Sequence, residues 1–235
     1  MRQYYRWVPV EDLASRTSLD LAGAALALWS FAQLRAPGAT KIRLYNPLLE
    51  QHGWYSKYTV IEIITDDMPF LVGSITMDLT RRACGIHLTI HPVVRLRRDH
   101  DGQLIDVLAP DARAADETLE SVLHIEVSRE TGTDRLVALQ ASLTHVLGQV
   151  RAAVEDWPAM RRRLHEIAGS LAGAAPGLES AELEEGRAFL EWLDERHFTF
   201  LGYRDYEFVR GDSGDALRAV DGSGLGILRA SASGA

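Results

Sequence analysis

The alternation of apolar and polar residues predicts several strands. Residues 58–64, YTVIEII, form a β-branched run of strand length that stops at the polar pair Asp66 and Asp67. Asp101-Gly102 is a hairpin signal that returns the chain along residues 103–108, and residues 122–127, VLHIEV, alternate with Leu123, Ile125 and Val127 inward. Residues 86–97 predict a half-buried strand whose apolar side chains share one face, namely Ile86, Leu88, Ile90, Val94 and Leu96.

Apolar residues three or four positions apart predict helices between these strands. Thr17 with Asp20 gives a loose capping signal for a helix that ends before Pro37 and Gly38. Its expected buried stripe is Leu19, Ala22, Leu26 and Trp29.

Three further helices follow the same spacing. The first starts at residues 68–73, MPFLVG, with Pro69 in its first turn and Gly85 as its left-handed stop. Residues 136–154 predict a long amphipathic helix that Trp157-Pro158 breaks, and a shorter stripe follows over 160–171. The last helix spans about 181–196 and leads into a strand-like segment, HFTFLGYRDYEFV.

Strand, helix, strand, hairpin, strand and helix between residues 58 and 155 is the order of the ferredoxin-like βαββαβ sandwich of the α+β class. We expect an antiparallel sheet with one face under two helices, in which residues 123–127 lie between the strands 58–64 and 86–97. Residues 1–57 add an N-terminal helix, a short strand (KIRLYN) and a loop, and residues 156–197 add helices. Residues 198–235 predict the start of a further, truncated β-containing domain.

Composition narrows the class of protein. The net charge of −8 argues against binding to the phosphate backbone of nucleic acids. One cysteine, Cys84, fits a reducing compartment, and no apolar run reaches the length of a bilayer span or a signal peptide. We therefore expect a cytoplasmic protein with neither nucleic-acid nor membrane partners.

Asp66 and Asp67 stand where a strand passes into a helix, so backbone N–H groups of the first helical turn are available for an anion such as an amino-acid carboxylate. The acidic pair would then receive the amino group of that ligand. The competing interpretation is an ordinary helix N-cap. The candidate effector loop comprises Asp66, Asp67, Met68, Pro69, Phe70, Leu71 and Val72.

Other residues favour structural roles. Four positions along a strand separate the rings of His87 and His91 by about 13 Å, too far for one metal ion. Cys84 is predicted to be a buried structural thiol, and His124 and Glu126 share a strand face that could meet a helix or a partner chain.

The remaining motifs are weak. Gly222, Gly224 and Gly226 resemble half of a dinucleotide fingerprint, but no βαβ unit follows them within the nine residues after Gly226. The arginines at 161–163 predict a solvated face, and residues 189–203, FLEWLDERHFTFLGY, predict core. Because no acid, base and nucleophile converge, we expect no catalytic residues and no metal, and hence a binding or regulatory module.

Long blocks of the sequence resemble a known family. TVIEIITDDMPFLVGSITMDLTRR, VRAAVEDWPAMRRRL, FLEWLDERHFTFLGYRDYEF and GSGLGIL together resemble the N-terminal portion of the large bacterial NAD-specific glutamate dehydrogenases, over nearly the whole chain. The resemblance implies a much longer polypeptide that deaminates L-glutamate with NAD to 2-oxoglutarate and ammonia. It places that chemistry, and the NAD site, in a region C-terminal to this chain, which itself is expected to hold no cofactor.

The same resemblance implies an ACT domain, a βαββαβ module that binds amino-acid effectors or pairs with its own kind. Many ACT domains carry an Asp, a Pro and a Gly in the ligand loop between the first strand and the first helix. Asp67 and Pro69 match this pattern, whereas Phe70 replaces the glycine with a bulky side chain.

Four functions remain open at this point. The leading hypothesis is a non-catalytic regulatory and assembly segment of a homo-oligomeric glutamate dehydrogenase, with the C-terminal catalytic region and other subunits as partners. The alternatives are an amino-acid sensor that uses residues 66–72, and a pure oligomerisation scaffold that pairs through the stripe at 136–154. A small enzyme that uses Asp66 and Asp67 as acid and base is the fourth.

Overall fold

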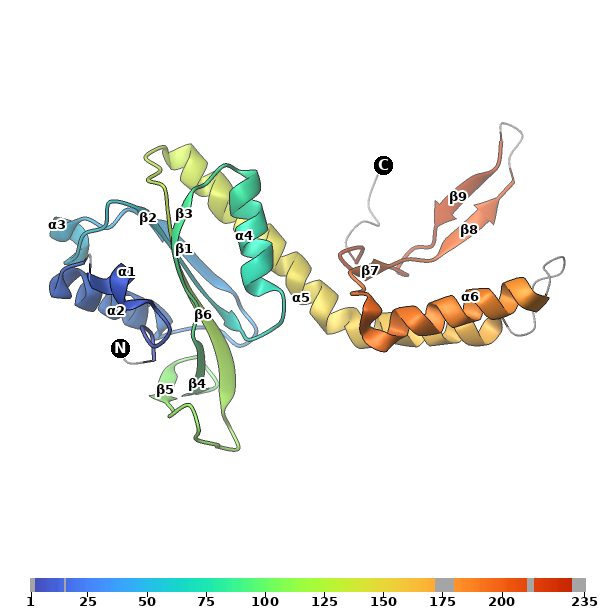
Figure 1. The fold of residues 1–235 in the computed structure, drawn as a ribbon, viewed down its shortest axis with the longest axis horizontal. Coiled ribbons are helices and arrows are strands. Elements are labelled where there is room, and N and C mark those ends of the chain that lie inside the picture. Colours follow the sequence, from blue (N-terminus) through green and yellow to red (C-terminus); the bar gives the residue numbers. More distant parts are fainter. Residues whose placement is uncertain (1–2, 15, 172–179, 211–213, 230–235) are drawn as a thin grey trace. The chain divides into compact units, whose positions relative to one another are not determined.

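The computed structural model describes residues 3–14, 16–171, 180–210 and 214–229 (Figure 1). The chain divides into two compact units, Met1–Leu147 and Gly148–Ala235. Each unit is described by itself below. None of the helices in the described ranges combines the length and the apolar character that a bilayer span requires.

The first unit joins helices to a six-stranded sheet. In chain order its elements are α1 (Val10–Ala14), α2 (Ser18–Ala32), β1 (Lys41–Tyr45), α3 (Leu49–His52), β2 (Thr59–Asp66), α4 (Leu71–Arg81), β3 (Ile86–Ile90), β4 (Val93–Arg98), β5 (Leu104–Val107), β6 (Thr118–Val127) and the start of α5 (Thr133–Ser170).

The strand order in the sheet is β1-β2-β6-β4-β5, with β3 also paired to β6, and all pairs are antiparallel. Strand β6 therefore lies between β2 and β3–β4, as the sequence predicts. Ile61 pairs with Ile125, and Ile63 with Leu123. The expectation of a mixed fold with an antiparallel sheet is confirmed.

The edge of the sheet beside β2 differs from the expected βαββαβ order. In that order the last strand follows the second helix and lies next to the first strand. Here β1, which precedes β2 in the chain, pairs with β2 over Lys41–Tyr45, and within the described residues no strand after α5 joins this sheet. The N-terminal segment thus completes the sheet.

Both faces of the sheet are covered, not one. Figure 1 shows α1, α2 and α3 on one side and α4 with the first part of α5 on the other. Strand β2 is accordingly buried at every residue except Asp66, which explains why it reads as a continuous apolar run. On the α2 side Leu28 packs with a cluster from the sheet and the N-terminal segment that comprises Tyr4, Ile64, Leu88, Ile90 and Val122.

Helix α2 begins as predicted but buries another face. Thr17 Oγ1 accepts from the backbone N–H of Asp20, which confirms the cap. Of the predicted stripe, however, Leu19, Leu26 and Trp29 are exposed, and Ala24 and Leu28 are buried instead. The helix is apolar nearly all round, so periodicity does not select one face.

Two turns show where backbone freedom matters. The predicted hairpin at Asp101-Gly102 joins β4 to β5, and Gly102 has φ +84 with an added Cβ only 2.2 Å from the carbonyl oxygen of Arg35. The left-handed residue after α4 is Ala83, with φ +57, and not the predicted Gly85.

The second unit contains the rest of α5, α6 (Ser180–Trp192), a π-helical turn η1 (Leu193–His197) and two small sheets, β7 (Gly202–Tyr203) with β10 (Leu225–Gly226) and β8 (Tyr206–Val209) with β9 (Ala216–Ala219). The predicted break at Trp157-Pro158 is wrong, because α5 continues through Pro158. The proline removes one helical hydrogen bond, while Ala153 and Met160 on either side are buried and hold the helix.

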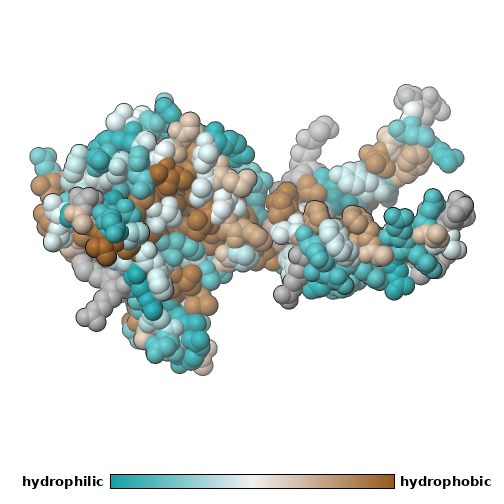
Figure 2. Space-filling view, viewed as in Figure 1, coloured by the Kyte–Doolittle hydropathy of each residue, from teal (hydrophilic) through white to brown (hydrophobic). Residues whose placement is uncertain are grey.

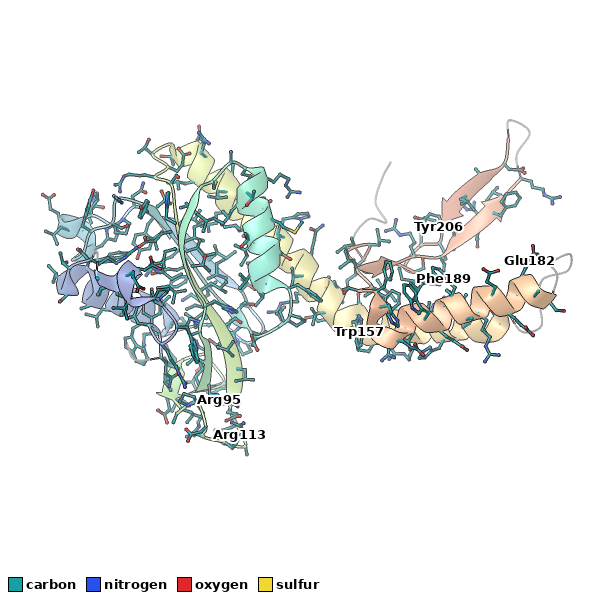
Figure 3. The ribbon with its side chains drawn as sticks, in the orientation of Figure 1. Arg95, Arg113, Trp157, Glu182, Phe189 and Tyr206 are labelled. Carbon is teal, nitrogen blue, oxygen red and sulfur yellow. The ribbon has the colours of Figure 1, made fainter. Side chains whose placement is uncertain are left out.

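Two further expectations for this unit are wrong. Arg161 and Arg163 do not form a merely solvated face: the guanidinium of Arg161 makes two hydrogen bonds to Asp194, and Arg163 binds Asp205. The aromatic segment at 189–203 is not core either, since its exposed large side chains include Phe189, Trp192, Phe198 and Leu201. Figure 3 marks Phe189 on α6.

Candidate functional site

The candidate effector loop runs from the end of β2 to the start of α4. The residue before α4 is Phe70, which has φ 72 and ψ −4 and makes no side-chain capping hydrogen bond. Phe70 thus adopts the left-handed conformation that glycine takes most readily. The first turn of α4 begins without a side-chain cap, so neither Asp66 nor Asp67 acts as the N-cap.

Asp66 belongs to a charge network below the loop. Arg35 Nη2 lies 2.7 Å from Asp66 Oδ1 and 2.7 Å from Glu120 Oε1. Arg98 also donates to both oxygens of Glu120, at 2.7 and 2.8 Å. The side chains of Arg35, Arg98 and Glu120 are buried, so two guanidinium groups neutralise the Glu120 carboxylate away from water. The Asp66 side chain, in contrast, is 36% exposed.

Asp67 is held against β6. Its backbone N–H donates to the carbonyl oxygen of Leu119, and its Oδ1 accepts from Ser121 Oγ at 2.6 Å. Ser121 Oγ is also 3.0 Å from His91 Nε2. Burial lowers the pKa of His91, with Asp67 acting in the opposite direction, which favours the neutral ring. Because Ser121 Oγ donates its proton to Asp67, it accepts from the His91 ring.

A ligand at this loop would therefore interact with backbone groups more than with the two carboxylates. Both carboxylates already have partners in the chain, which leaves less capacity for a ligand's amino group than the sequence suggests. Of the other loop residues, Leu71 is buried, Met68 and Val72 are half-buried, and Pro69 and Phe70 are exposed. A ligand carboxylate would find the uncapped first turn of α4 next to the Phe70 ring.

A second group of charged residues lies buried on the sheet face that α2 covers. His124 stands between two carboxylates, with Nδ1 3.7 Å from Glu62 Oε1 and Nε2 3.6 Å from Glu126 Oε1. All three side chains are at most 1% exposed. Arg16 makes two hydrogen bonds to Glu126, at 2.5 and 2.6 Å, and Arg43 pairs with Glu62.

The electrostatics of this buried charge cluster follow from its geometry. Burial by itself would raise the pKa of Glu126, but hydrogen bonds from Arg16 and the attraction of His124 lower it to about 2. Burial would lower the pKa of His124, and the carboxylates of Glu126 and Glu62 outweigh it, so the pKa is raised above its ordinary value. The cluster therefore favours a protonated histidine between two ionised glutamates.

Three buried polar atoms around His124 have no hydrogen-bond partner among the described residues: Tyr4 Oη, Trp54 Nε1 and His124 Nδ1. The rings of Tyr4 and Trp54 lie 5.9 and 6.4 Å from that of His124. Burial raises the pKa of Tyr4 well above its ordinary range, so its hydroxyl stays protonated. These atoms make the cluster a polar centre inside an otherwise apolar layer.

The sequence carries a faint signal for this cluster. Glu62 interrupts the apolar run 58–64, and His124 and Glu126 share one strand face, which we expected to meet a helix or a partner chain. That face is covered by the N-terminal segment of the same chain. Arg16 and Arg43 are distant in sequence, so no local pattern joins them to the strands.

The other singled-out residues lie apart from one another. His87 Nε2 is 3.0 Å from Ser128 Oγ, and its ring stacks on Tyr58. Cys84 is partly exposed, and burial raises the pKa of its thiol. Gly226 pairs with Gly202 in a two-stranded sheet and does not open a helix, unlike a glycine of a dinucleotide fingerprint. Among the described residues no group of His, Cys, Asp and Glu side chains is placed to share a metal ion.

An antiparallel sheet with α4 following β2 through an uncapped loop is consistent with the class of ACT-type domains. Residues 1–143 match the family described as the ACT1 domain of glutamate dehydrogenase. The chain is 41% identical to the NAD-specific glutamate dehydrogenase of Halomonas elongata and 35% identical to that of Pseudomonas aeruginosa, over 96% and 97% of its length. It is also 26% identical over 72% of its length to the enzyme of that name from Mycobacterium tuberculosis.

This chain belongs to the NAD-specific glutamate dehydrogenase family and corresponds to its N-terminal region. It spans 14% of the length of the relatives from Halomonas elongata and Pseudomonas aeruginosa. Most of the polypeptide in those proteins therefore lies outside the region described above.

Proposed function

We propose that this chain is a non-catalytic regulatory and assembly segment of an NAD-dependent glutamate dehydrogenase. In this proposal the intact enzyme converts L-glutamate and NAD to 2-oxoglutarate, ammonia and NADH in a region that this chain does not contain. The chain contributes contacts to that region and to other subunits, in the cytoplasm. Its sheet is a variant of the ferredoxin-like arrangement in which β1 takes the place of the last strand.

One observation carries the proposal. The match to the relatives covers nearly all of this chain but 14% of their length, and the part matched by a domain family is an ACT1 domain. The carboxylates that a catalytic interpretation would use, Asp66 and Asp67, are bound to Arg35 and Ser121. These contacts give both carboxylates a structural role within the chain.

A spectrophotometric assay tests the non-catalytic part. The 235-residue chain, mixed with glutamate and NAD, should produce no NADH above the rate of a buffer blank, and added intact enzyme should restore turnover in the same cuvette. NADH formation that scales with the concentration of the 235-residue chain would contradict the proposal.

A second candidate function, amino-acid sensing at residues 66–72, is favoured by the uncapped α4 and the left-handed Phe70. Isothermal titration of the chain with single amino acids at millimolar concentration tests it. We expect a binding heat that disappears in a Phe70→Asp variant, because the introduced carboxylate repels a ligand carboxylate. A Ser74→Pro variant is less informative, because it would abolish the heat only if α4 itself unfolds. An absence of heat for every common amino acid would contradict sensing and leave the assembly role.

A further inference from the structure

The β8–β9 hairpin of the second unit has one mixed and one apolar face. Its strands form an isolated two-stranded sheet. The mixed face carries Val209 with Ala216 and the pair Glu207 with Arg218, where Arg218 Nη2 lies 2.9 Å from Glu207 Oε2. The opposite face carries the cross-strand pairs Phe208 with Leu217 and Tyr206 with Ala219.

The apolar face is open to solvent within the described part of the chain. Tyr206 is 53% exposed, Phe208 60% and Leu217 68%. Figure 2 shows brown, apolar residues on this hairpin, and Figure 3 marks Tyr206 at its base. A two-stranded hairpin is marginally stable in water by itself, and an antiparallel sheet with one apolar face is normally covered on that face.

The base of the hairpin, in contrast, is firmly attached inside the second unit. Arg163 Nη2, on α5, lies 2.7 Å from Asp205 Oδ2 immediately before β8. The backbone N–H of Val220 donates to the carbonyl oxygen of Asp205 at 2.9 Å and closes the ladder. The hairpin therefore has a fixed origin and presents its apolar face as a preformed surface.

The size of this face indicates what covers it. A fully buried aromatic side chain contributes about 150–250 Å². Tyr206, Phe208 and Leu217 are each only 53–68% exposed, so the four side chains offer less than the roughly 800 Å² per partner that a stable interface between separate molecules needs. A covalently linked segment requires less area, because the tether supplies a high effective concentration.

The family relationship supplies such a segment. The ACT1 match ends at residue 143, whereas the similarity to the Halomonas elongata enzyme covers 96% of the chain and extends through this unit. The chain spans 14% of that relative, so a long stretch of polypeptide remains to provide a second layer.

We propose that the apolar face of Tyr206, Phe208, Leu217 and Ala219 is covered in the intact enzyme by an apolar strand or helix from the polypeptide that follows residue 235. The hairpin is then the first layer of the domain that comes after the ACT1 domain. This inference rests on the proposed function, in which the chain is the beginning of a longer enzyme.

Cysteine alkylation measured by peptide mass spectrometry tests the inference. Phe208→Cys and Leu217→Cys place reporters on the apolar face, and Glu207→Cys and Arg218→Cys are matched controls on the opposite face of the same strands. In the 235-residue chain all four should react at similar rates. In the intact enzyme the two apolar-face cysteines should react about tenfold or more slowly than their controls, because reaction then needs local opening.

The other outcomes are equally decisive. Equal rates on both faces of the intact enzyme would overturn the inference. Protection of positions 208 and 217 in the 235-residue chain that increases with protein concentration would overturn it in favour of a second copy. The readout is independent of turnover: a 235-residue chain that oxidises glutamate refutes the proposed function, whatever the alkylation pattern. Cys84 serves in every sample as an internal standard for reagent activity.

Discussion

Arg35 and Asp66 are joined by an ion pair in which Nη2 lies 2.7 Å from Oδ1. Arg35 follows α2, and Asp66 is the last residue of β2, where the candidate effector loop begins. The pair therefore ties the start of this loop to the N-terminal segment, which precedes the βαββ region in the chain. The same guanidinium contacts Glu120, whose side chain is fully buried. The position of the loop therefore depends on the N-terminal segment of the chain.

Arg35→Met should strongly destabilise the first unit. The change leaves Asp66 without this cation and Glu120 with Arg98 alone, and breaking a buried pair costs about 3–5 kcal/mol. Urea unfolding followed by circular dichroism measures the loss. Arg97→Met is the control, because its pair with Asp116 is exposed and contributes less than about 1 kcal/mol. Similar losses in both variants would show that the buried network contributes no more to the free energy of unfolding than an exposed ion pair does.

Phe70→Gly should raise the free energy of unfolding. The left-handed conformation costs a residue with a side chain about 1–2 kcal/mol, while the extra freedom of glycine in the unfolded chain offsets about 0.5–1 kcal/mol. We expect a net gain of up to about 1.5 kcal/mol by chemical denaturation. Phe70→Ala removes the ring and keeps the strain, so it should show no gain. A loss in Phe70→Gly would mean that the half-exposed ring makes contacts that outweigh the strain.

Gly102→Ala and Gly38→Ala separate two effects at left-handed glycines. Gly38 has φ +71 and open space around an added Cβ, so its variant should lose about 1 kcal/mol. Gly102 has φ +84, and its Cβ would lie 2.2 Å from the carbonyl oxygen of Arg35, so backbone must also move. We expect a loss of more than about 2 kcal/mol there, measured by thermal and urea unfolding. Equal losses would rule out the close approach.

Glu126 should make stability depend on acid pH. Its pKa of about 2 in the folded chain lies below the ordinary value of 4.5. Its contribution, about 3 kcal/mol, is therefore complete above pH 4.5 and is lost as the pH falls toward 2. Glu126→Gln should be less stable at neutral pH and should show a flatter decline over this window. A parallel decline in both proteins would contradict the assignment.

His124 should act in the opposite direction. Its pKa is raised in the folded chain, so its contribution is complete below the ordinary value of 6.5 and is lost as the pH rises through the folded value. Ring proton shifts in NMR titration should place the His124 midpoint above the ordinary value of 6.5. A midpoint below 6.5 would show that burial prevails over the two carboxylates.

The sequence predicts the strands of the first unit well because their signals are local. Alternation at 122–127, the β-branched run at 58–64 and Asp101-Gly102 each mark an element that the structure contains. The segment 86–97, expected as one strand, instead forms two strands, β3 and β4, that are separated at His91 and Pro92. Helix faces and ends were predicted less well. Leu26 and Trp29 are exposed because a helix that is apolar all round does not define its buried side.

The site shows a sharper limit. The strand-to-helix position of Asp66 and Asp67 is visible in the sequence, but their partners Arg35 and Ser121 are brought to them by tertiary packing. The buried charge cluster combines Arg16, Glu62 and His124 from three distant segments. These residues come together because the N-terminal segment covers the second face of the sheet. No hydrophobic periodicity in the sequence predicts that this face is covered.

The pairing of β1 with β2 makes the N-terminal segment indispensable for solubility. A chain that started at residue 58 would leave the backbone of β2 unpaired along one side, next to the apolar run 58–64. Such a naked strand is a template for intermolecular β-pairing and fibril growth. Truncation at that point would therefore yield insoluble aggregate, whereas a fragment that keeps residues 41–45 would be shielded from this fate.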